Sequence, residues 1–326
     1  MKIKIFFVII FLFAACKDDR DMDLQLNYFH FTEYLFSTDS TTIDSRQLVW
    51  ESELGSFGPY FDYYIMGRRD TNNLNYQKQI LNFVNHNDMR EVYDSICINF
   101  NDLEVLERDI NLAFSRYADF FPEEDLPKII TLFSGFNYGV MAQDSIIAIG
   151  LDFFLGRNSK FYDYLGDPNY VKQQKEPEFI LPYIMEVWYN QLFESDGTNF
   201  LSKMVEKGKL IYFLHKTLPE YSIANKLRFT QEELEWCEYN ERAIWSYFIE
   251  EELLFSERES DFRSYLNYAP FAKGMPRDSP GRVAYYIGFR IVSSFMKKQS
   301  HISLEELIGM RDAQLILKES KYKPER

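Results

Sequence analysis

The sequence predicts a predominantly helical α+β fold, in which a single large domain is built around a small β-sheet. Apolar residues recur at helical spacing through most of the chain after Leu48, whereas β-branched runs are confined to residues 128–156. No linker rich in Pro, Gly or Ser divides the 326 residues. A chain of this length with many Phe and Tyr side chains can bury a large core, so we expect one large domain or two closely packed ones, and favour one.

The first fifteen residues have the pattern of a bacterial lipoprotein signal peptide. A basic start is followed by an apolar run over residues 5–13, which is shorter than the roughly 20 residues that a membrane-spanning helix needs. The small residues Ala14 and Ala15 directly precede Cys16. We therefore expect residues 1–15 to be removed as a signal peptide and Cys16 to become the lipidated N-terminus. The alternative is an ordinary secretory signal in which Cys16 is incidental.

The charge of the chain limits its partners. It carries 50 acidic and 36 basic side chains, a net charge of −14. Such a surface repels nucleic acid and anionic lipid, so we expect no nucleic-acid partner. Two or more acyl chains hold a protein stably on a membrane, and lipidation of Cys16 is therefore the expected membrane anchor.

Residues 16–45 are predicted to form the lipidated N-terminus and a polar spacer, which precedes a globular domain over residues 46–326. The spacer ends in a stretch rich in Ser, Thr and Asp. Apolar residues between Leu24 and Phe31 indicate, in addition, a first strand that docks on the domain.

The clearest early helix is predicted over residues 103–120, where apolar residues recur at spacings of three and four and share one face. Asn101 or Asp102 is the expected N-cap, and Pro122 marks the end. Strands are predicted at residues 129–133 and 145–151, in the only substantial sheet. Further helices are predicted over residues 178–193, 198–217, 230–255, 279–298 and 303–317.

Two cysteines remain beyond Cys16. A disulfide between Cys97 and Cys237 is possible in an oxidising periplasm. Cys97 lies in an apolar run, however, and Cys237 follows a Trp in a helical pattern. Buried free thiols are therefore the favoured interpretation, and the disulfide is the alternative.

Recognised catalytic and metal-binding motifs are missing from the sequence. The four histidines are isolated from one another, whereas a helical zinc site needs two imidazoles one turn apart with a glutamate between them. There is no C-x-x-C, G-x-S-x-G, phosphate loop or dinucleotide fingerprint. The acidic runs are expected to be solvated helix faces. We therefore predict no cofactor and no metal.

One constellation near the C-terminus is more specific. Ser279 is the expected N-cap of the helix over residues 279–298, with Pro280 in its first turn and a buried stripe on one face. Gly288 lies in the middle of that helix and is expected to allow close approach of another backbone. Arg282 and Arg290 are expected to project from the same helix. The residues that define this constellation are Pro270, Phe271, Ser279, Pro280, Gly281, Arg282 and Gly288.

At these residues the chain resembles the gliding-motility lipoprotein family GldB of the Bacteroidetes. The resemblance extends to residues 208–214, 245–249 and 321–324, and Lys17-Asp18-Asp19 is similar to the surface-export signal of lipoproteins from that lineage. It implies a lipid-anchored protein of the cell envelope, expected at the outer membrane on either its periplasmic face or the cell surface. It also implies partners among other gliding-machinery and type IX secretion proteins.

The family is itself distantly similar to predicted zinc peptidases of the zincin kind. That similarity implies a strand at residues 146–151 whose free edge pairs with an extended peptide, followed by a metal-binding helix. The corresponding helix keeps Glu186 but has Met185 and Tyr189 where both histidines would stand. Met and neutral Tyr are poor zinc ligands, so the expected fold is zincin-like without the metal motif. Glu186 is then a relic or a buried hydrogen-bonding group.

Three functions follow from these observations. The leading hypothesis is a non-catalytic lipoprotein of the gliding apparatus, a pseudo-peptidase whose cleft near Met185, Glu186 and Tyr189 binds a partner. The second is a metal-dependent hydrolase that uses unrecognised ligands, such as Glu186 with Glu241 and a distant histidine. The third is a surface lipoprotein for glycan capture, in which aromatic residues such as those at 60–64 stack on sugars, although such a stripe is more often core.

Overall fold

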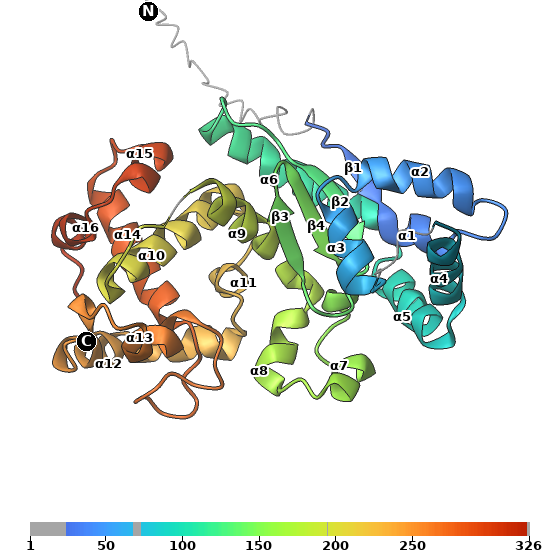
Figure 1. The fold of residues 1–326 in the computed structure, drawn as a ribbon. Coiled ribbons are helices and arrows are strands. Elements are labelled where there is room, and N and C mark those ends of the chain that lie inside the picture. Colours follow the sequence, from blue (N-terminus) through green and yellow to red (C-terminus); the bar gives the residue numbers. More distant parts are fainter. Residues whose placement is uncertain (1–23, 68–72, 194, 325–326) are drawn as a thin grey trace, which may run out of the picture.

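A four-stranded mixed sheet lies at the centre of the computed structural model, which describes residues 24–67, 73–193 and 195–324 (Figure 1). Its strand order is β1 (Tyr28–His30), β2 (Lys128–Leu132), β4 (Ile146–Gly150) and β3 (Val140–Gln143). β1, β2 and β4 are parallel, and β3 runs antiparallel to β4. The two strands predicted from β-branched runs correspond to β2 and β4, so the predicted α+β class is confirmed. Cys16 and residues 1–15 lie outside the described residues.

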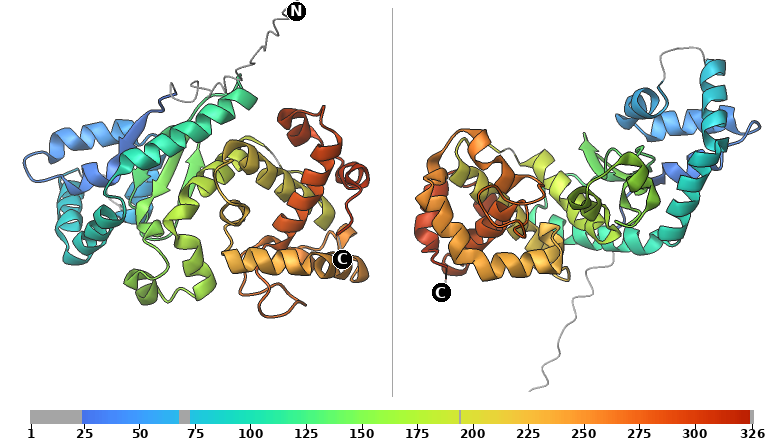
Figure 2. Two further views of the ribbon diagram at one scale, coloured as in Figure 1. Left: turned by 180° about the vertical axis from the view of Figure 1, so that it is seen from behind. Right: turned by 90° about the horizontal axis from the view of Figure 1, so that it is seen from below.

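Helices cover both faces of the sheet (Figures 1 and 2). α6 (Leu103–Phe120) lies on one face and is bonded to β1. The Tyr28 hydroxyl donates to the Glu107 carbonyl at 3.1 Å and to Asn111 Oδ1 at 2.9 Å. On the other face lie α2 (Ile43–Glu53) and α3 (Phe57–Tyr60). The view from behind in Figure 2 shows α6 in front of the strands, on the side opposite α3.

The folded domain begins before residue 46, which corrects the predicted end of the spacer. β1 pairs with β2 in the register Tyr28 to Ile129, and α1 (Phe31–Phe36) follows it without a break. Phe31 and Phe36 of α1 are buried. The docked first strand is confirmed, because residues 28–36 belong to the core and not to a polar spacer.

The remaining helices form two groups. α4 (Asn73–Asn85) and α5 (Asn87–Asn99) lie near α1 and α3, and α7 (Lys160–Leu165) and α8 (Asn169–Lys172) follow β4. The helices from α9 onward gather on the other side of the sheet, as Figures 1 and 2 show. They are α9 (Ile180–Leu192), α10 (Phe200–Thr217), α11 (Ile223–Leu227), α12 (Gln231–Glu250), α13 (Glu259–Leu266), α14 (Val283–Lys298), α15 (Leu304–Gly309) and α16 (Ala313–Ser320).

A helix begins where it was predicted to begin when the predicted capping residue does cap it. α6 begins after Asp102, whose carboxylate accepts a hydrogen bond from the Glu104 amide at 3.1 Å, as predicted. The predicted start of the last long helix at Ser279 is wrong, because α14 begins only at Val283. The helix predicted over residues 303–317 is broken into α15 and α16.

Two glycines bring α10 and α14 into backbone contact. A Cβ atom added at Gly208 would lie 2.2 Å from the Gly288 carbonyl oxygen, and one added at Gly288 would lie 2.0 Å from the Met204 carbonyl oxygen. No side chain fits in that space, which is the close approach expected for Gly288.

Cys97 and Cys237 are free thiols. Cys237 is buried, but Cys97 is exposed, which corrects the expectation that both would be buried. Within the described ranges, no helix has the length and apolar character that crossing a membrane requires.

Candidate functional site

The two sequence motifs singled out above meet in a buried ion cluster around Glu186. This residue lies on α9, beside the sheet, and only 6 % of its surface is exposed. Its carboxylate faces two guanidinium groups, from Arg228 and Arg282, which lie on connections between the C-terminal helices. The cluster therefore joins the sheet-bearing part of the molecule to the helices beyond α9.

Arg228 comes from the short connection between α11 and α12. It occupies the left-handed region, with φ of 55°, because the chain turns there before Thr230 caps the next helix. Its Nη2 donates to Glu186 Oε2 at 2.5 Å, and 3 % of the residue is exposed. Nothing in the sequence marks this arginine except its position between two helices, and sequence analysis missed it.

Arg282 comes from the loop that precedes α14. Its Nη2 lies 3.3 Å from Glu186 Oε1, while Nη1 donates to the Leu227 carbonyl at 3.2 Å and to the Tyr268 hydroxyl. Arg282 has φ of 57° and stands one residue before the helix, so it does not project from α14 together with Arg290. That prediction is corrected: Arg282 points into the interior.

The predicted motif builds the loop that places Arg282. The Ser279 hydroxyl accepts a hydrogen bond from the Ala272 amide at 3.0 Å, so Ser279 closes the loop and is not the N-cap of α14. A Cβ atom added at Gly281 would lie 2.7 Å from the Asn267 carbonyl oxygen, so only glycine fits. The Arg282 amide then donates to the same carbonyl at 3.2 Å.

The other members of the motif differ in burial. Pro280 is buried within the loop, whereas Pro270 is exposed and Phe271 has 39 % of its surface exposed. Pro270 and Phe271 therefore lie on the surface, and only the second half of the motif reaches the cluster.

Tyrosine rings cover the faces of the two guanidiniums. Arg228 Cζ lies 3.9 Å from the ring centroid of Tyr183, and Arg282 Cζ lies 3.9 Å from that of Tyr285. Tyr268 contacts both, at 5.2 Å from Arg228 and 4.6 Å from Arg282. Such cation–π contacts are strongest where water is excluded, so the rings help to offset the burial of two positive charges.

The cluster keeps Glu186 ionised. Burial alone would raise the pKa of this carboxyl, but the charges of Arg228 and Arg282 outweigh burial and lower it to about 2. A general base works best when its pKa lies near the operating pH, so a carboxylate held at this value is a weak base. The chemistry of the cluster is that of a structural ion pair.

The positive charge in the cluster is not fully matched. Two guanidiniums face one carboxylate, and the Arg228 Nε has no hydrogen-bond partner among the described residues. Because burying an unpaired charge is costly, removal of Glu186 is expected to leave a large destabilising imbalance.

The positions where a zinc helix would carry histidines are packed into the interior. Met185 is fully buried, and Tyr189 packs its ring 5.2 Å from that of Phe213. Of the three residues predicted to form a cleft, Tyr189 lines a cavity of about 410 Å³, whereas Met185 and Glu186 are buried. In the part of the chain that is described, no three His, Cys, Asp or Glu side chains are grouped to hold a metal ion.

β4, which corresponds to the strand predicted to have a free edge, has no free edge. β4 is paired on both sides, with β2 in parallel and with β3 in antiparallel orientation. β3 therefore occupies the edge that an extended peptide would need. Glu241, the second carboxylate of the hydrolase hypothesis, has other partners: it accepts hydrogen bonds from Tyr286 at 2.9 Å and Tyr322 at 2.8 Å.

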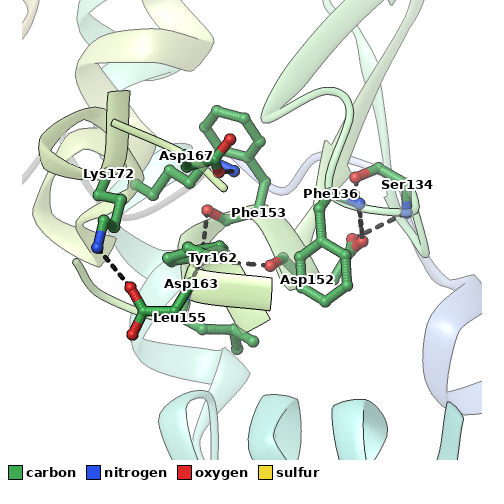
Figure 3. Close-up of polar contacts among 10 residues, drawn as sticks. Ser134, Phe136, Asp152, Phe153, Leu155, Tyr162, Asp163, Asp167 and Lys172 are labelled. Carbon is green, nitrogen blue, oxygen red and sulfur yellow. Dashed lines mark hydrogen bonds and ion pairs between the residues drawn. The ribbon is translucent and has the colours of Figure 1, made fainter. Parts of the chain in front are cut away.

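A second buried carboxylate, Asp152, lies just after the end of β4 (Figure 3). It accepts hydrogen bonds from the backbone amides of Ser134 at 2.8 Å and Phe136 at 2.6 Å. Burial raises its pKa, the hydrogen bonds from Ser134 and Phe136 lower it, and the result is about 6. Gly135 and Phe136 both have positive φ, so Asp152 holds the sharp turn that follows β2.

Exposed tyrosines gather near that turn. Tyr63 and Tyr64 lie on a π-helical turn, Phe61–Ile65, and are 64 % and 68 % exposed. Tyr138 is 50 % exposed, and Tyr60 packs against both Tyr64 and Tyr138. Within the aromatic stretch at residues 60–64, Phe61 belongs to the core, whereas Tyr63 and Tyr64 do not.

Comparison with known proteins gives a match to a protein family. The family model described as "Gliding motility protein GldB" matches residues 15–324. No curated protein and no solved structure matches the chain. The matched range includes Cys16, the α9 helix and the whole loop that carries Arg282.

Proposed function

Because the chain belongs to the family of the gliding motility protein GldB, we propose that it is a lipoprotein of the gliding apparatus that acts through protein partners and not by catalysis. Membership in the family supports a gliding-associated lipoprotein of the cell envelope. The non-catalytic role and the identity of the partners go beyond the family match.

The observation that carries the non-catalytic role is the position of Glu186. Its carboxylate is held by Arg228 and Arg282, its pKa is lowered to about 2, and Met185 beside it is buried. A general base needs access to a water and to the substrate, and a pKa near the operating pH. Glu186 has neither property, so we assign it to the structure of the domain.

The anchor and the location follow from the N-terminus. Acyl chains on Cys16 would hold the acidic domain on the membrane, and we place it at the outer membrane, on the periplasmic face or on the cell surface. Its partners are then other gliding-machinery proteins or proteins associated with type IX secretion.

The candidate groove for a partner is the cavity that Tyr189 lines. Three basic residues, Lys207, Lys209 and Arg311, and two acidic ones, Glu206 and Glu305, also line it, so basic residues outnumber acidic ones there although the net charge of the chain is −14. This local excess of one basic residue favours an acidic segment of the partner over a basic one.

Gliding assays of a Glu186→Asp variant test the non-catalytic role. Aspartate keeps the negative charge between the arginines but shortens the side chain, and a misplacement of about 1 Å costs a catalytic base roughly 100-fold in rate. We expect normal gliding when this variant replaces the wild-type chain. Loss of gliding by a variant with a wild-type circular dichroism spectrum, or stoichiometric zinc in the lipoprotein extracted with detergent, would favour the hydrolase.

The exposed tyrosines favour glycan capture as a second candidate function. At least half of the surface of each of Tyr63, Tyr64 and Tyr138 is exposed, and aromatic side chains on a surface can pack on sugars. Retention on a glycan column that is lost in a Tyr63→Ser/Tyr64→Ser variant would support it. Co-purification of gliding proteins without glycan retention would support the first proposal instead.

A further inference from the structure

We propose that the cavity beside Thr32 and Thr131 binds a small neutral sugar. The cavity has a volume of about 330 Å³, at the lower end of the range of roughly 300–1,000 Å³ for small-molecule sites. It is separate from the Glu186 cluster and from the Tyr189 cavity. The proposal concerns a ligand and not a protein partner, so it does not depend on the proposed function.

The cavity lies at the carboxyl ends of the parallel strands. Thr32 follows β1, Thr131 is the fourth residue of β2, and Leu151 follows β4. The C-terminal half of α5 and the start of α6 complete the wall. Ligands of open sheets with parallel strands bind at this end of the strands, because the connections diverge there and leave a crevice.

Two hydroxyl groups in the wall have no partner within the described residues. Thr32 Oγ1 and Thr131 Oγ1 are buried and make no hydrogen bond, although the residues are only 1 % and 3 % exposed. Nearly all buried polar side chains in folded proteins are hydrogen-bonded. Two unpartnered hydroxyls on one cavity therefore indicate that a polar molecule completes their hydrogen bonds.

The lining selects the class of that molecule. None of the described lining residues is a Lys, Arg or His, and the one charged residue is the exposed Glu33, so an anion has no counter-charge and is repelled. Threonine hydroxyls both donate and accept, as sugar hydroxyls do, and Asn101 adds an amide at the mouth. Tyr93 and Phe100 supply aromatic surface for the apolar face of a sugar ring.

Cys97 provides a direct reporter of occupancy, because it lines the cavity and is exposed, whereas Cys237 is buried. The rate at which a maleimide modifies Cys97 should be measured on the full lipoprotein extracted in detergent, with glucose, galactose, mannose or N-acetylglucosamine added. We expect at least one of them to slow the reaction saturably, and inorganic phosphate to have no effect. A Cys97→Ser variant identifies the labelled thiol.

The variant Thr131→Val removes one unpartnered hydroxyl at nearly constant shape. The sugar concentration that gives half-maximal protection should rise about fivefold, as expected for one lost neutral hydrogen bond. Thr217→Val is the matched control, because Thr217 is also buried but its hydroxyl donates to the Phe213 carbonyl at 3.1 Å. It should leave protection unchanged.

Melting temperatures separate the proposal from a merely structural role of Thr131. Without sugar, Thr131→Val should melt at the same or a higher temperature than the wild type, whereas Thr217→Val should melt at a lower one. The proposal is overturned if no sugar of the panel protects Cys97, if protection is the same in Thr131→Val, or if Thr131→Val melts as low as Thr217→Val.

Discussion

Arg282 and Glu186 are 96 positions apart in the chain, yet their side chains meet in the interior, with Nη2 3.3 Å from Oε1. This pair connects two features that the sequence presents separately. The loop motif around Ser279 and Gly281 positions Arg282, and Glu186 on α9 pairs with it. Glu186 thus has a structural role in this fold.

Replacement of Glu186 by glutamine should destabilise the protein strongly. The substitution leaves Arg228 and Arg282 buried without a counter-charge, and removing one partner of a buried ion pair costs about 3–5 kcal/mol. The free energy of unfolding in urea measures this loss.

Glu220→Gln is the matched control for that measurement. Glu220 pairs with Arg116 at 2.6 Å, but its side chain is 43 % exposed, so the change should stay below about 1 kcal/mol. Equal losses in the two variants would contradict the assignment of Glu186 to a buried cluster.

Sequence patterns predicted the parts of the fold that depend on local rules. The β-branched runs gave β2 and β4, and the spacing of apolar residues together with Asp102 gave α6. The short strand β3 was missed, because four residues with little β-branching become a strand only by pairing with β4. The start of α14 was misplaced because Ser279 bonds to a distant amide and not to its own helix.

The candidate site depended on tertiary contacts that no local pattern encodes. Glu186 was recognised through the zincin resemblance, and Arg282 through the loop motif. Their pairing could not be predicted, because it depends on how α9 and α14 pack. Arg228 carries no motif at all, and its role follows only from the turn that directs it toward Glu186.

Substitution of Gly288 by alanine should separate α10 from α14. The new Cβ atom would lie 2.0 Å from the Met204 carbonyl oxygen, which is backbone and cannot move independently of its helix. Overpacking of a well-packed interior typically costs about 1–3 kcal/mol, and we expect the upper part of that range because backbone is involved. Thermal unfolding of the wild type and of the Gly288→Ala variant measures the loss of stability.

Gly309→Ala serves as the control for the helix contact. Gly309 ends α15, and a Cβ atom added there meets nothing within 4 Å. Its melting temperature should stay level or rise slightly, since alanine lowers the conformational entropy of the unfolded chain. If the Gly288→Ala variant melts at the same temperature as Gly309→Ala, the close approach of α10 and α14 does not contribute to stability.

The stability of the protein should fall between about pH 4 and pH 6 through Asp152. Its pKa is about 6 in the folded state against 3.8 for an ordinary Asp, so the folded state binds a proton that the unfolded state has lost. The contribution is fully present below pH 3.8 and is lost as the pH rises through 6, and it amounts to roughly 3 kcal/mol. Glu186, with its pKa lowered to about 2, acts in the opposite direction, because its contribution is lost as the pH falls from 4.5 through 2.

An Asp152→Asn variant isolates this effect. Asparagine does not titrate, so the difference in unfolding free energy between wild type and variant should decrease as the pH rises from 4 to 6. Parallel profiles of the two chains over that range would mean that Asp152 is ionised throughout.

Substitution of Cys16 by serine should release the protein from the membrane. The net charge of −14 gives the domain no overall electrostatic attraction to anionic lipid, so we expect acyl chains on Cys16 to hold the protein on the membrane. We expect the Cys16→Ser chain in the soluble fraction after cell lysis and gliding to stop. Cys97→Ser, which removes a thiol from the folded domain, should remain in the membrane fraction and support normal gliding. A Cys16→Ser protein that is soluble while cells still glide would show that the apparatus needs the domain but not its anchor, because a partner alone then holds it in place.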